Sequence, residues 1–595
     1  MSKLKFKLKE NPIGEFSFDY LKDYLESLGI EKTESFIKDP SPEDEESYNN
    51  LENIDEMVEE LYFAFENDKK FFLQVDSDTD GYTSSAIFYL FFKELYPNAR
   101  IEWRLHDGKE HGVITDTVPI DADYIIIPDA GSMQFDEHEE LSRRGYKILI
   151  MDHHLVDKIP EHPGLIVVNN QNSPRFINKS LSGAGVVYKV IQAFNERYAE
   201  KFPQIHRNYI DLAALGIVAD MMDTRTLDNN FIIHYGLKNI QNPMFLALLE
   251  KQQFSIERSG ASILEPTKIT LAFYVAPLIN AVIRFGTKEE KEELFEGFIL
   301  TDNGRIKETQ YKGEVRKENF HDYVARISTN IRARQNREKT KSMEFLKHRI
   351  EEEGLDKEQL LIVITSKDDE VPVPQTITGL VAMELLKEYK KPVLVLRPKS
   401  DGGGGTMYAG SGRGKQNGEF NSLLELLRES ELCEFVEGHD MAHGVGIKEA
   451  NMKAVVDYAN LRLKDVEFDV QSVEVDYIFH NATINREMIS AFGRAMYLYG
   501  NGIPQPKFAF TLNVAADAIR LVGKNQNVIS FNIEGVDFVS FNAAEAINKM
   551  KEDSSNLYEI NLVGRAQINE WMGREKPQIM IDELDIKAIG LADLF

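Results

Sequence analysis

The feature that most constrains this chain is residues 71–81, FFLQVDSDTDG, where a bulky apolar run ends in three aspartates and a glycine. The apolar run predicts a buried β-strand, and the acidic part predicts the loop at the carboxyl end of that strand. The next residues, YTSSAIFYLFFKEL, predict a helix. Because Asp76, Asp78 and Asp80 repel one another unless a cation neutralises them, the unit predicts half of a divalent-metal site. A solvated turn is the alternative, since turns favour the same residue types.

Three more strands are predicted further along, in DADYIIIPDAGS, KILIMDHHLVD and GLIVVNN, and helical segments alternate with them. This alternation predicts an α/β fold with a doubly wound, mainly parallel sheet. The carboxyl ends of such strands share one edge, where ligands bind. We therefore expect the polar residues at these ends to converge there: Asp76, Asp78, Asp80, Asp129, Asp152, His153 and His154.

A further carboxylate, Asp220, follows the apolar helical run in YIDLAALGIVADMMD. At the end of a buried helix it needs a cation or hydrogen-bond donors, although it also fits a simple helix terminus. Aspartates with one or two imidazoles suit Mn²⁺ or Mg²⁺, and the lack of thiols opposes structural zinc. The cluster exceeds the needs of one ion and predicts two, about 3.5–4 Å apart and bridged by one aspartate, which favours hydrolysis at phosphorus. The alternative to a functional role for the adjacent His153 and His154 is a structural one, in which one ring packs in the interior and the other is exposed.

Composition limits the classes of protein that remain. A chain of 595 residues predicts several domains, about four by length. Its net charge of −28 opposes general affinity for nucleic acid, so binding would need a local basic groove. The single cysteine, Cys433, excludes an intramolecular disulfide framework and fits a reducing compartment. With no secretory leader or long apolar span in view, we expect a cytoplasmic protein that does not contact membranes.

Four motifs, VDSDTDG, PDAGS, MDHH and ALGIVADMMD, in this order, resemble those of the DHH phosphoesterase superfamily. Four later stretches are similar to the RecJ branch: APLINAVIRFG (276–286), GSGRG (410–414), EGHDMAHGVGI (437–447) and GNGIPQPKF (500–508). The resemblance covers about residues 20–595. It implies a single-strand-specific 5′→3′ exonuclease that uses Mn²⁺ or Mg²⁺ and releases nucleoside 5′-monophosphates in DNA recombination, repair or replication. The family's GDYDADG, GGH and SGRS become VDSDTDG, EGH and SGRG here, and no expected ligand is lost.

The residues and the resemblance together give the expected site. We expect the metal ligands to be Asp76, Asp78, Asp80, Asp129, Asp152, His153 and Asp220, with Asp78 and Asp80 ranked above Asp76. Catalysis is assigned to His154, His153 and Asp129, with His154 contacting substrate and His153 as a ligand.

Substrate-binding residues are expected in later segments. Gly410, Ser411 and Gly412 are expected in a flexible turn whose amides bind an anion, with Arg413 holding phosphate; a plain turn is the alternative. The resemblance implies that His439 touches the scissile phosphate, although a structural role also fits. It also implies that Asn280 and Arg284 bind the 5′-terminal phosphate region, with Arg104 as a less favoured candidate.

We expect five regions: a helical, acidic and solvated lead-in (1–68), a DHH catalytic domain (69–300), a long connecting helix (301–352), a second α/β domain that binds substrate (353–462) and an OB-fold-like β-barrel (463–595). Within the connecting segment, residues 332–350 contain seven Lys or Arg and two Glu. They would supply the basic groove, or belong to a solvated helix. In the barrel, Phe531, Phe538, Phe541 and Trp571 are expected to be mostly core, with one or two left to stack on bases.

Two other functions fit the same pattern. One is a DHH phosphodiesterase for short oligonucleotides or cyclic dinucleotides, which the barrel opposes because a dinucleotide needs no strand holder. The other is a non-catalytic replication-complex scaffold, which the intact acidic set opposes. For the preferred nuclease we expect a monomer that binds single-stranded DNA, with a single-strand-binding protein or a helicase as further partners.

Overall fold

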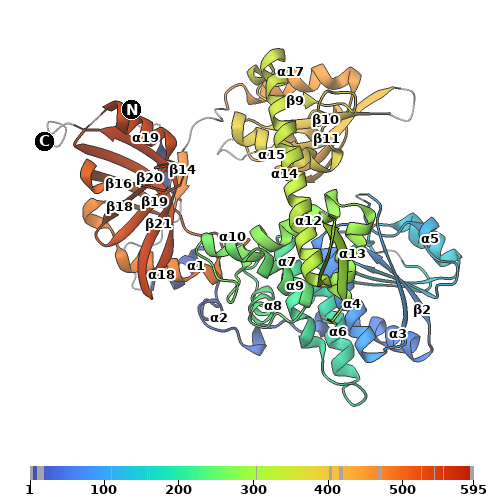
Figure 1. Ribbon diagram of the computed structural model, residues 1–595. Coiled ribbons are helices and arrows are strands. Elements are labelled where there is room, and N and C mark those ends of the chain that lie inside the picture. Colours follow the sequence, from blue (N-terminus) through green and yellow to red (C-terminus); the bar gives the residue numbers. More distant parts are fainter. Residues whose placement is uncertain are drawn as a thin grey trace. The chain divides into compact units, whose positions relative to one another are not determined.

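The computed structural model (Figure 1) describes residues 4–9, 19–108, 110–156, 158–159, 161–302, 304–311, 313–400, 405–414, 420–466, 468, 472–523, 525–541, 543–553, 555–571 and 573–589. The chain divides into two compact units. The first comprises Met1–Ile283, Thr287–Ser328 and Gln471–Phe595, and the second comprises Arg284–Gly286 and Thr329–Val470.

The first unit contains a five-stranded sheet in the order β3-β2-β4-β5-β6, and every neighbouring pair is parallel. Its strands are β2 (Lys70–Val75), β3 (Arg100–Leu105), β4 (Tyr124–Pro128), β5 (Lys147–Asp152) and β6 (Leu165–Asn169). The predicted parallel sheet is therefore confirmed. Its strands carry the residues after Val75, Pro128 and Met151 to one edge, because parallel strands end on the same side.

Helices cover both faces of this sheet. The rings of Phe71 in β2 and Phe65 in α3 (Ile54–Glu66) stack 4.3 Å apart on one face. On the other face Phe72, Ile125 and Ile127 share a buried cluster with Leu141 of α5 (Phe135–Arg143). The alternation of contacts along the strands explains why their sequence is apolar throughout. Further helices of this part are α4 (Thr79–Leu95), α6 (Gly183–Arg197), α7 (Ile210–Ala219), α8 (Leu227–Lys238), α9 (Pro243–Lys251), α10 (Gln253–Arg258), α11 (Lys268–Thr270), α12 (Ala276–Phe285) and α13 (Lys288–Ile299).

One stretch within the described residues, Lys268–Phe285, is long and apolar enough to cross a membrane, and 56% of it is buried inside the structure. Burial of that kind is typical of a core helix.

The lead-in differs from the solvated helical segment that we expected. Its first described element is a strand, β1 (Lys5–Leu8), which pairs in parallel with β14 (Ser472–Val475). The short helices α1 (Tyr20–Ser27) and α2 (Glu34–Ile37) follow. The acidic connector is anchored, because Glu45 pairs with Arg207 and the backbone N–H of Asn178 donates to Glu46 at 2.8 Å. These cations and amides lie far away in sequence, which is why composition alone suggested a solvated segment.

The connecting segment is only partly helical. The expected helix over residues 301–352 is therefore wrong for the first part of that range. Residues there form a hairpin of β7 (Ile306–Tyr311) and β8 (Glu314–Asn319), with Gly313 at φ +85° between the strands. The strands are exposed, so polar residues occupy both faces and no apolar alternation marks them. The long helix α14 then runs from Phe320 to Glu353.

The second unit holds a sheet in the order β12-β13-β11-β10-β9. Its elements are β9 (Leu361–Ile364), α15 (Thr378–Tyr389), β10 (Val393–Ser400), β11 (Thr406–Arg413), α16 (Leu423–Glu429), β12 (Cys433–His439), β13 (Ala442–Lys448) and α17 (Met452–Leu463). The expected turn at Gly410–Gly412 is wrong, because these residues lie in β11 and pair with β10 and β13. A Cβ on Gly410 would lie 2.0 Å from the Val395 carbonyl oxygen, so glycine here permits close strand approach.

The C-terminal part of the first unit is a seven-stranded sheet in the order β15-β16-β20-β21-β19-β18-β17. Its elements are β15 (Tyr477–His480), α18 (Arg486–Arg494), β16 (Phe508–Ala515), β17 (Arg520–Val522), β18 (Val528–Ile533), β19 (Val536–Ser540), α19 (Ala544–Asp553), β20 (Leu557–Trp571) and β21 (Arg574–Ala588). Phe531 and Phe538 are buried and stacked at 5.1 Å, which confirms them as core, whereas Phe541 is 59% exposed. The side chain of Trp571 lies outside the described residues.

Candidate metal centre

The acidic loop after β2 is held in place by its own helix and by a neighbouring loop. Asp78 is the N-cap of α4, and its Oδ1 accepts a hydrogen bond from the Gly81 N–H at 2.9 Å. The Asp76 carboxylate accepts from the Gly112 N–H at 3.1 Å and lies 2.6 Å from His111 Nδ1. Asp76 therefore ties the acidic loop to the loop after β3. Asp76 also forms a group of possible metal ligands with Asp78 and Asp129. The structure therefore gives no reason to rank Asp76 below Asp78 and Asp80 as a ligand.

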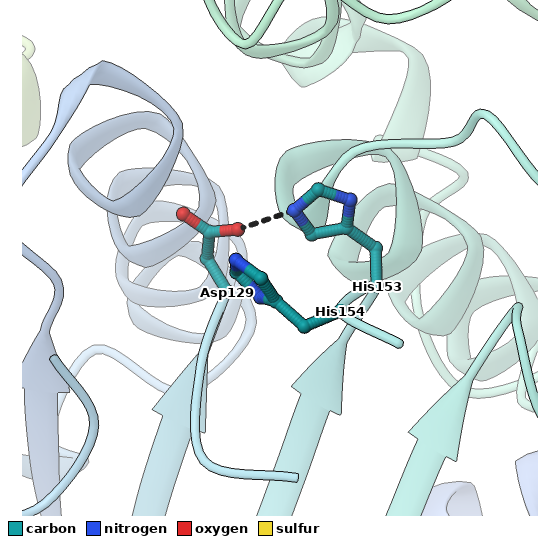
Figure 2. A group of neighbouring side chains, drawn as sticks. All are labelled: Asp129, His153 and His154. Carbon is teal, nitrogen blue, oxygen red and sulfur yellow. Dashed lines mark ion pairs between the residues drawn. The ribbon is translucent and has the colours of Figure 1, made fainter. Parts of the chain in front are cut away.

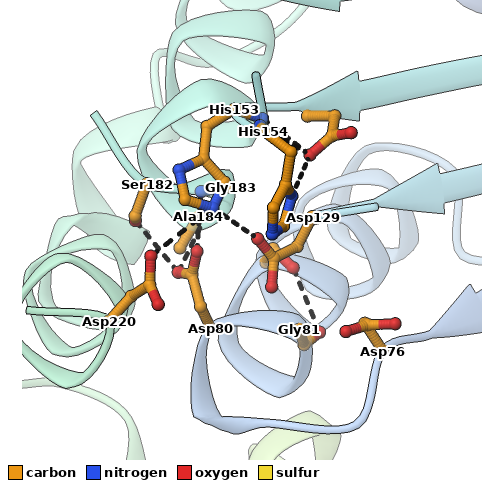
Figure 3. A network of polar contacts seen from close by, with 12 residues as sticks. Asp76, Asp80, Gly81, Asp129, His153, His154, Ser182, Gly183, Ala184 and Asp220 are labelled. Atoms are coloured by element: carbon orange, nitrogen blue, oxygen red, sulfur yellow. Dashed lines mark hydrogen bonds and ion pairs between the residues drawn. The ribbon is translucent and has the colours of Figure 1, made fainter. Parts of the chain in front are cut away.

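Asp80 points at the N-terminus of α6 (Figure 3). Its carboxylate accepts from Ser182 Oγ at 2.9 Å, the Gly183 N–H at 2.6 Å and the Ala184 N–H at 3.1 Å. Free N–H groups and the helix dipole both stabilise a carboxylate at this position. The donors fix the orientation of this buried side chain within the cluster.

Asp129 follows β4 in a left-handed conformation, with φ +63°. Its Oδ1 lies 3.2 Å from His153 Nε2 (Figure 2). That oxygen is buried and receives no hydrogen bond from any described residue. A Cβ on Gly183 would lie 2.4 Å from the same oxygen, so the helix can approach only because residue 183 is glycine. An orphaned, buried carboxylate oxygen among other acids fits a metal ligand.

Asp152 is surrounded by protein donors. Its oxygens accept from the Ser132 N–H at 3.0 Å, the His153 N–H at 2.7 Å and His154 Nδ1 at 2.7 Å. Burial would raise the pKa of Asp152, but the hydrogen bond and charge of His154 outweigh it and hold the pKa below its usual range. The expected role of Asp152 as a metal ligand stays a proposal. Its hydrogen bonds fix the ring of His154 and the backbone of His153.

Asp220 caps the C-terminus of α7 and completes the cluster. Its Oδ2 lies 3.4 Å from His153 Nε2, the same ring nitrogen that Asp129 Oδ1 approaches (Figure 3). His153 is therefore the central residue, because it lies near both Asp129 and Asp220.

Three overlapping groups of possible ligand atoms result, and within each group the atoms lie within 4.8 Å of one another. The groups are Asp76, Asp78 and Asp129; Asp80, His153 and Asp220; and Asp129, His153 and His154. Burial, followed by repulsion from Asp76 and Asp80, raises the pKa of Asp78 to about 6. Burial and the charges of Asp80 and Asp78 raise the pKa of Asp220 to about 8 and that of Asp129 well above its usual range. Such crowding is unfavourable in the ionised form, and oxygen-rich sets with imidazole fit Mn²⁺ or Mg²⁺.

Sequence reasoning missed the histidines of HDGKEHG. His111 contacts Asp76, and the buried ring of His106 lies 3.2 Å from Gln74 Nε2 and 3.9 Å from Asp76 Oδ1. The available signal was position, because this loop follows β3, whose carboxyl end reaches the same sheet edge. Arg104, the less favoured substrate-binding candidate, lies in β3 opposite Gln74.

Asn280 of α12 lies next to the acidic loop, since Thr79 Oγ1 donates to Asn280 Oδ1 at 3.0 Å. The structure thus brings this expected substrate-binding residue beside the cluster.

The other expected substrate-binding residues belong to the second unit. Arg413 ends β11, and burial and the charge of Arg284 lower the pKa of its guanidinium. Among the described residues, neither arginine has a carboxylate partner. Ser411 Oγ lies 3.0 Å from Thr378 Oγ1, and a Cβ on Gly412 would lie 2.5 Å from His443 Nε2. His439 is the last residue of β12, and its side chain lies outside the described residues.

Two family models match the chain. The DHH family, N-terminal domain, matches residues 70–217, and the RecJ OB domain matches residues 475–583. The first covers the parallel sheet and the cluster, and the second covers the C-terminal sheet.

Relatives span nearly the whole chain. The SPbeta prophage-derived YorK protein of Bacillus subtilis (strain 168), named as a candidate single-strand DNA-specific exonuclease, is 36% identical over 578 residues, covering 96% of this chain and 97% of its own. The single-stranded-DNA-specific exonuclease RecJ of the same organism is 24% identical and covers 91% of this chain and 65% of its own.

Solved structures agree on the fold. The crystal structure of RecJ in complex with Mn²⁺ from Thermus thermophilus has a TM-score of 0.70 at 20% identity, over 99% of this chain and 80% of that one. The crystal structure of RecJ in complex with Mg²⁺ from the same organism has a TM-score of 0.64 at 19% identity, over 98% of this chain and 78% of that one. With the motifs, the domain models and a relative 36% identical along its length, the chain belongs to the RecJ-like family of DHH exonucleases.

Proposed function

We propose that this chain is a metal-dependent exodeoxyribonuclease that removes nucleoside 5′-monophosphates from the 5′ end of single-stranded DNA. The observation that carries the proposal is the set of three ligand groups at the edge of the parallel sheet, of which one contains both Asp129 and His153 and each of the others contains one of the two. The relatives named as single-strand DNA-specific exonucleases support the substrate class. Recombination, repair or replication in the cytoplasm is the proposed setting.

Two divalent ions are proposed for the cluster. Asp76, Asp78 and Asp129 would hold one, and Asp80, His153 and Asp220 would hold the other. Asp129 belongs to the first of these sets, and its Oδ1 lies 3.2 Å from Nε2 of His153 in the second. Its carboxylate therefore suits a place next to both proposed ions. When bound, such ions activate water and stabilise the charge that develops at phosphorus.

The two histidines have different proposed roles. His153 is buried, and we assign it as a ligand; His154 has a side chain 52% exposed, and we assign it to substrate contact. Burial lowers the pKa of His154, but the hydrogen bond and charge of Asp152 outweigh this and raise it to about 9. Without metal the ring therefore favours its protonated form, which suits contact with a phosphate oxygen.

Strand binding is proposed to involve Asn280, Arg284, Arg413, Ser411, Gly412 and His439, with Arg104 less favoured. Arg413 and Arg284 support this, because two neighbouring cations without a carboxylate partner among the described residues favour an anion between or beside them. Phe541 of the C-terminal sheet is exposed and available for stacking on a base.

The basic residues of α14 contribute less than their number suggested. Lys339, Lys347 and Arg349 are within 3.0 Å of Glu384, Glu388 and Asp369 respectively. Their charge is largely neutralised inside the second unit. A structural role of the helix is therefore favoured over the basic groove.

A phosphodiesterase for dinucleotides is the alternative function. It needs the same cluster and has no use for a strand-binding domain at residues 475–583. A monomer and recruitment by a single-strand-binding protein or a helicase remain proposals.

The test compares the full-length chain with Asp129→Asn. Asparagine has the same shape and tolerates the left-handed backbone of residue 129, so this variant removes charge with little strain. Asp136→Asn, on the exposed first turn of α5, is the matched control. Each protein is incubated with Mn²⁺ and with 5′-labelled single strands, 3′-labelled single strands, duplexes or dinucleotides.

Early release of labelled mononucleotide from the 5′-labelled single strand, abolished in Asp129→Asn and kept in Asp136→Asn, is the expected result. Early release from the 3′ label would overturn the proposed direction. Activity confined to dinucleotides would favour the alternative, and strand binding without cleavage would favour a scaffold.

A further inference from the structure

A loop of the C-terminal part contacts the backbone directly after Asp220. This loop, Gly500–Ile503, closes on itself through hydrogen bonds from the Gly500 N–H to the Ile503 carbonyl at 2.9 Å and in the reverse direction at 3.2 Å. We call it the brace loop. Both parts belong to the first unit.

The turn that carries Asp220 is strained. After α7 the Met221 N–H donates to the Val218 carbonyl at 3.2 Å and the Met222 N–H to the Ile217 carbonyl at 3.1 Å. Met221 has φ +55°, in the left-handed region that helix ends usually reserve for glycine. A methionine in that conformation needs support from the surrounding structure.

The brace loop supplies that support through Asn501. Its side-chain Nδ2 donates a hydrogen bond to the Met221 carbonyl. Its own carbonyl accepts from the Thr224 N–H at 2.9 Å and from Thr224 Oγ1 at 2.7 Å. Gly502 follows at φ +82°, where a Cβ would lie 2.0 Å from Asp223 Oδ1. The brace loop thus contacts three of the four residues after Asp220.

The Asp220 carboxylate has little else to fix it. Its side chain is 30% exposed, and the nearest polar partner is His153 Nε2 at 3.4 Å. No described residue donates a hydrogen bond to it, in contrast to Asp80 and Asp152, which have several donors each. Its position therefore depends on the backbone turn.

We propose that Asn501 is a positioning residue for the metal ligand Asp220, and that the C-terminal domain thereby helps to complete the metal centre as well as hold DNA. This inference rests on the proposed role of Asp220 as a ligand. The brace loop, in this view, holds the left-handed Met221 turn in place. Residues that orient a ligand commonly change metal affinity when altered.

The decisive variant is Asn501→Asp, which keeps the size of the side chain and replaces the Nδ2 donor with an acceptor facing the Met221 carbonyl. Tyr497→Phe is the matched control, because Tyr497 Oη donates to the Ile37 carbonyl at 3.0 Å and the variant so removes a hydrogen bond of the C-terminal part that does not reach the turn after Asp220. Met221→Gly is combined with Asn501→Asp as a rescue, since glycine adopts the left-handed turn without support.

Thr224→Val is nearly isosteric and removes the hydrogen bond from Thr224 Oγ1 to the Asn501 carbonyl. This variant tests the inference if Asn501→Asp does not fold.

The measurement is Mn²⁺ binding by electron paramagnetic resonance titration of the full-length protein, alongside its melting temperature without metal. We expect about tenfold weaker binding in Asn501→Asp, wild-type binding in Tyr497→Phe, and recovery in the Met221→Gly double variant. Thr224→Val is expected to weaken binding by a smaller factor.

Equal Mn²⁺ affinity in Asn501→Asp and Tyr497→Phe, or no recovery with Met221→Gly, would overturn the inference. If Asn501→Asp does not fold, wild-type affinity in Thr224→Val would do so. A wild-type protein that binds Mn²⁺ without cleaving DNA would refute the proposed nuclease and leave this test of Asn501 intact.

Discussion

Individual carboxylates in the centre differ in what holds them. Asp80 and Asp152 are fixed by backbone and side-chain donors, whereas Asp129 keeps a buried oxygen without a hydrogen bond. Asp78 and Asp220 are buried and crowded by neighbouring acids, and burial followed by this repulsion raises the pKa of each. The fixed residues orient the cluster, and the crowded ones are those that a cation would stabilise most.

The crowded carboxylates predict how pH affects the metal-free protein. The folded chain keeps protons on Asp78 up to about pH 6 and on Asp220 up to about pH 8, whereas the unfolded chain loses them near 3.8. The folded state therefore binds more protons in this window, and its stability falls as pH rises towards 8. His153, whose pKa is lowered by burial, opposes this trend only below its ordinary value of 6.5.

The measurement is the melting temperature of EDTA-treated protein between pH 6.5 and 8. We expect it to decrease in the wild type and to change less in Asp220→Asn, in which one of the titrating groups is absent. A melting temperature that increases over this range in the wild type would contradict the assignment.

Glycine at 216 predicts a steric effect on the same cluster. A Cβ there would lie 2.2 Å from Asp80 Oδ1 and 2.5 Å from the Ala184 Cβ. Gly216→Ala is expected to destabilise the fold by about 1–3 kcal/mol, as overpacking does, and to weaken Mn²⁺ binding by displacing Asp80. Gly444→Ala, whose nearest atom would be 3.8 Å away, is the control. Thermal unfolding and Mn²⁺ titration of both variants test this, and equal behaviour of the two would refute it.

At the scale of elements, the N-terminal strand connects the two ends of the chain. β1 pairs with β14, and Leu4 packs in a buried cluster with Val475, Ala509 and Val563. A segment that composition alone placed in solvent is thus part of the C-terminal domain.

Deletion of residues 1–9 is expected to destabilise that domain, because it exposes the edge of β14 and an apolar cluster. Amide hydrogen exchange of Ser472–Val475 should become faster, while exchange in β4 and β5 should not change. Lys9→Met is the control, since it removes only the partly exposed ion pair of 2.7 Å between Lys9 and Asp476, a contact worth about 0–1 kcal/mol. Unchanged exchange in the deletion variant would show that β1 is dispensable.

At the scale of the whole molecule, hydrogen bonds from the protein itself hold several carboxylates of the centre in place. Asp76, Asp80 and Asp152 are each held by donors from elements distant in sequence. The fold should therefore survive removal of metal, unlike that of small proteins whose folding depends on an ion.

Chelation is expected to abolish nuclease activity while far-ultraviolet circular dichroism stays unchanged. Re-addition of Mn²⁺ at about 100 times its dissociation constant should stabilise the protein by about 2.7 kcal/mol through mass action and raise its melting temperature. Loss of secondary structure on chelation would refute preassembly. Asp129→Asn should show little of this metal-dependent increase.

The sequence by itself determined the parallel sheet and the strand ends that converge, because burial on both faces leaves continuous apolar runs and parallel strands end at one edge. That is why Asp76, Asp80, Asp129 and His153 could be expected at one edge, while Asp220 was expected from its place after an apolar helical run. Only the tertiary structure decided what each touches. It paired Asp152 with His154, brought His111 to Asp76, put Gly410–Gly412 inside a strand and set Asn501 against the turn after Asp220. Each of these contacts joins residues through backbone geometry or through distant elements, and neither periodicity nor composition records such pairings.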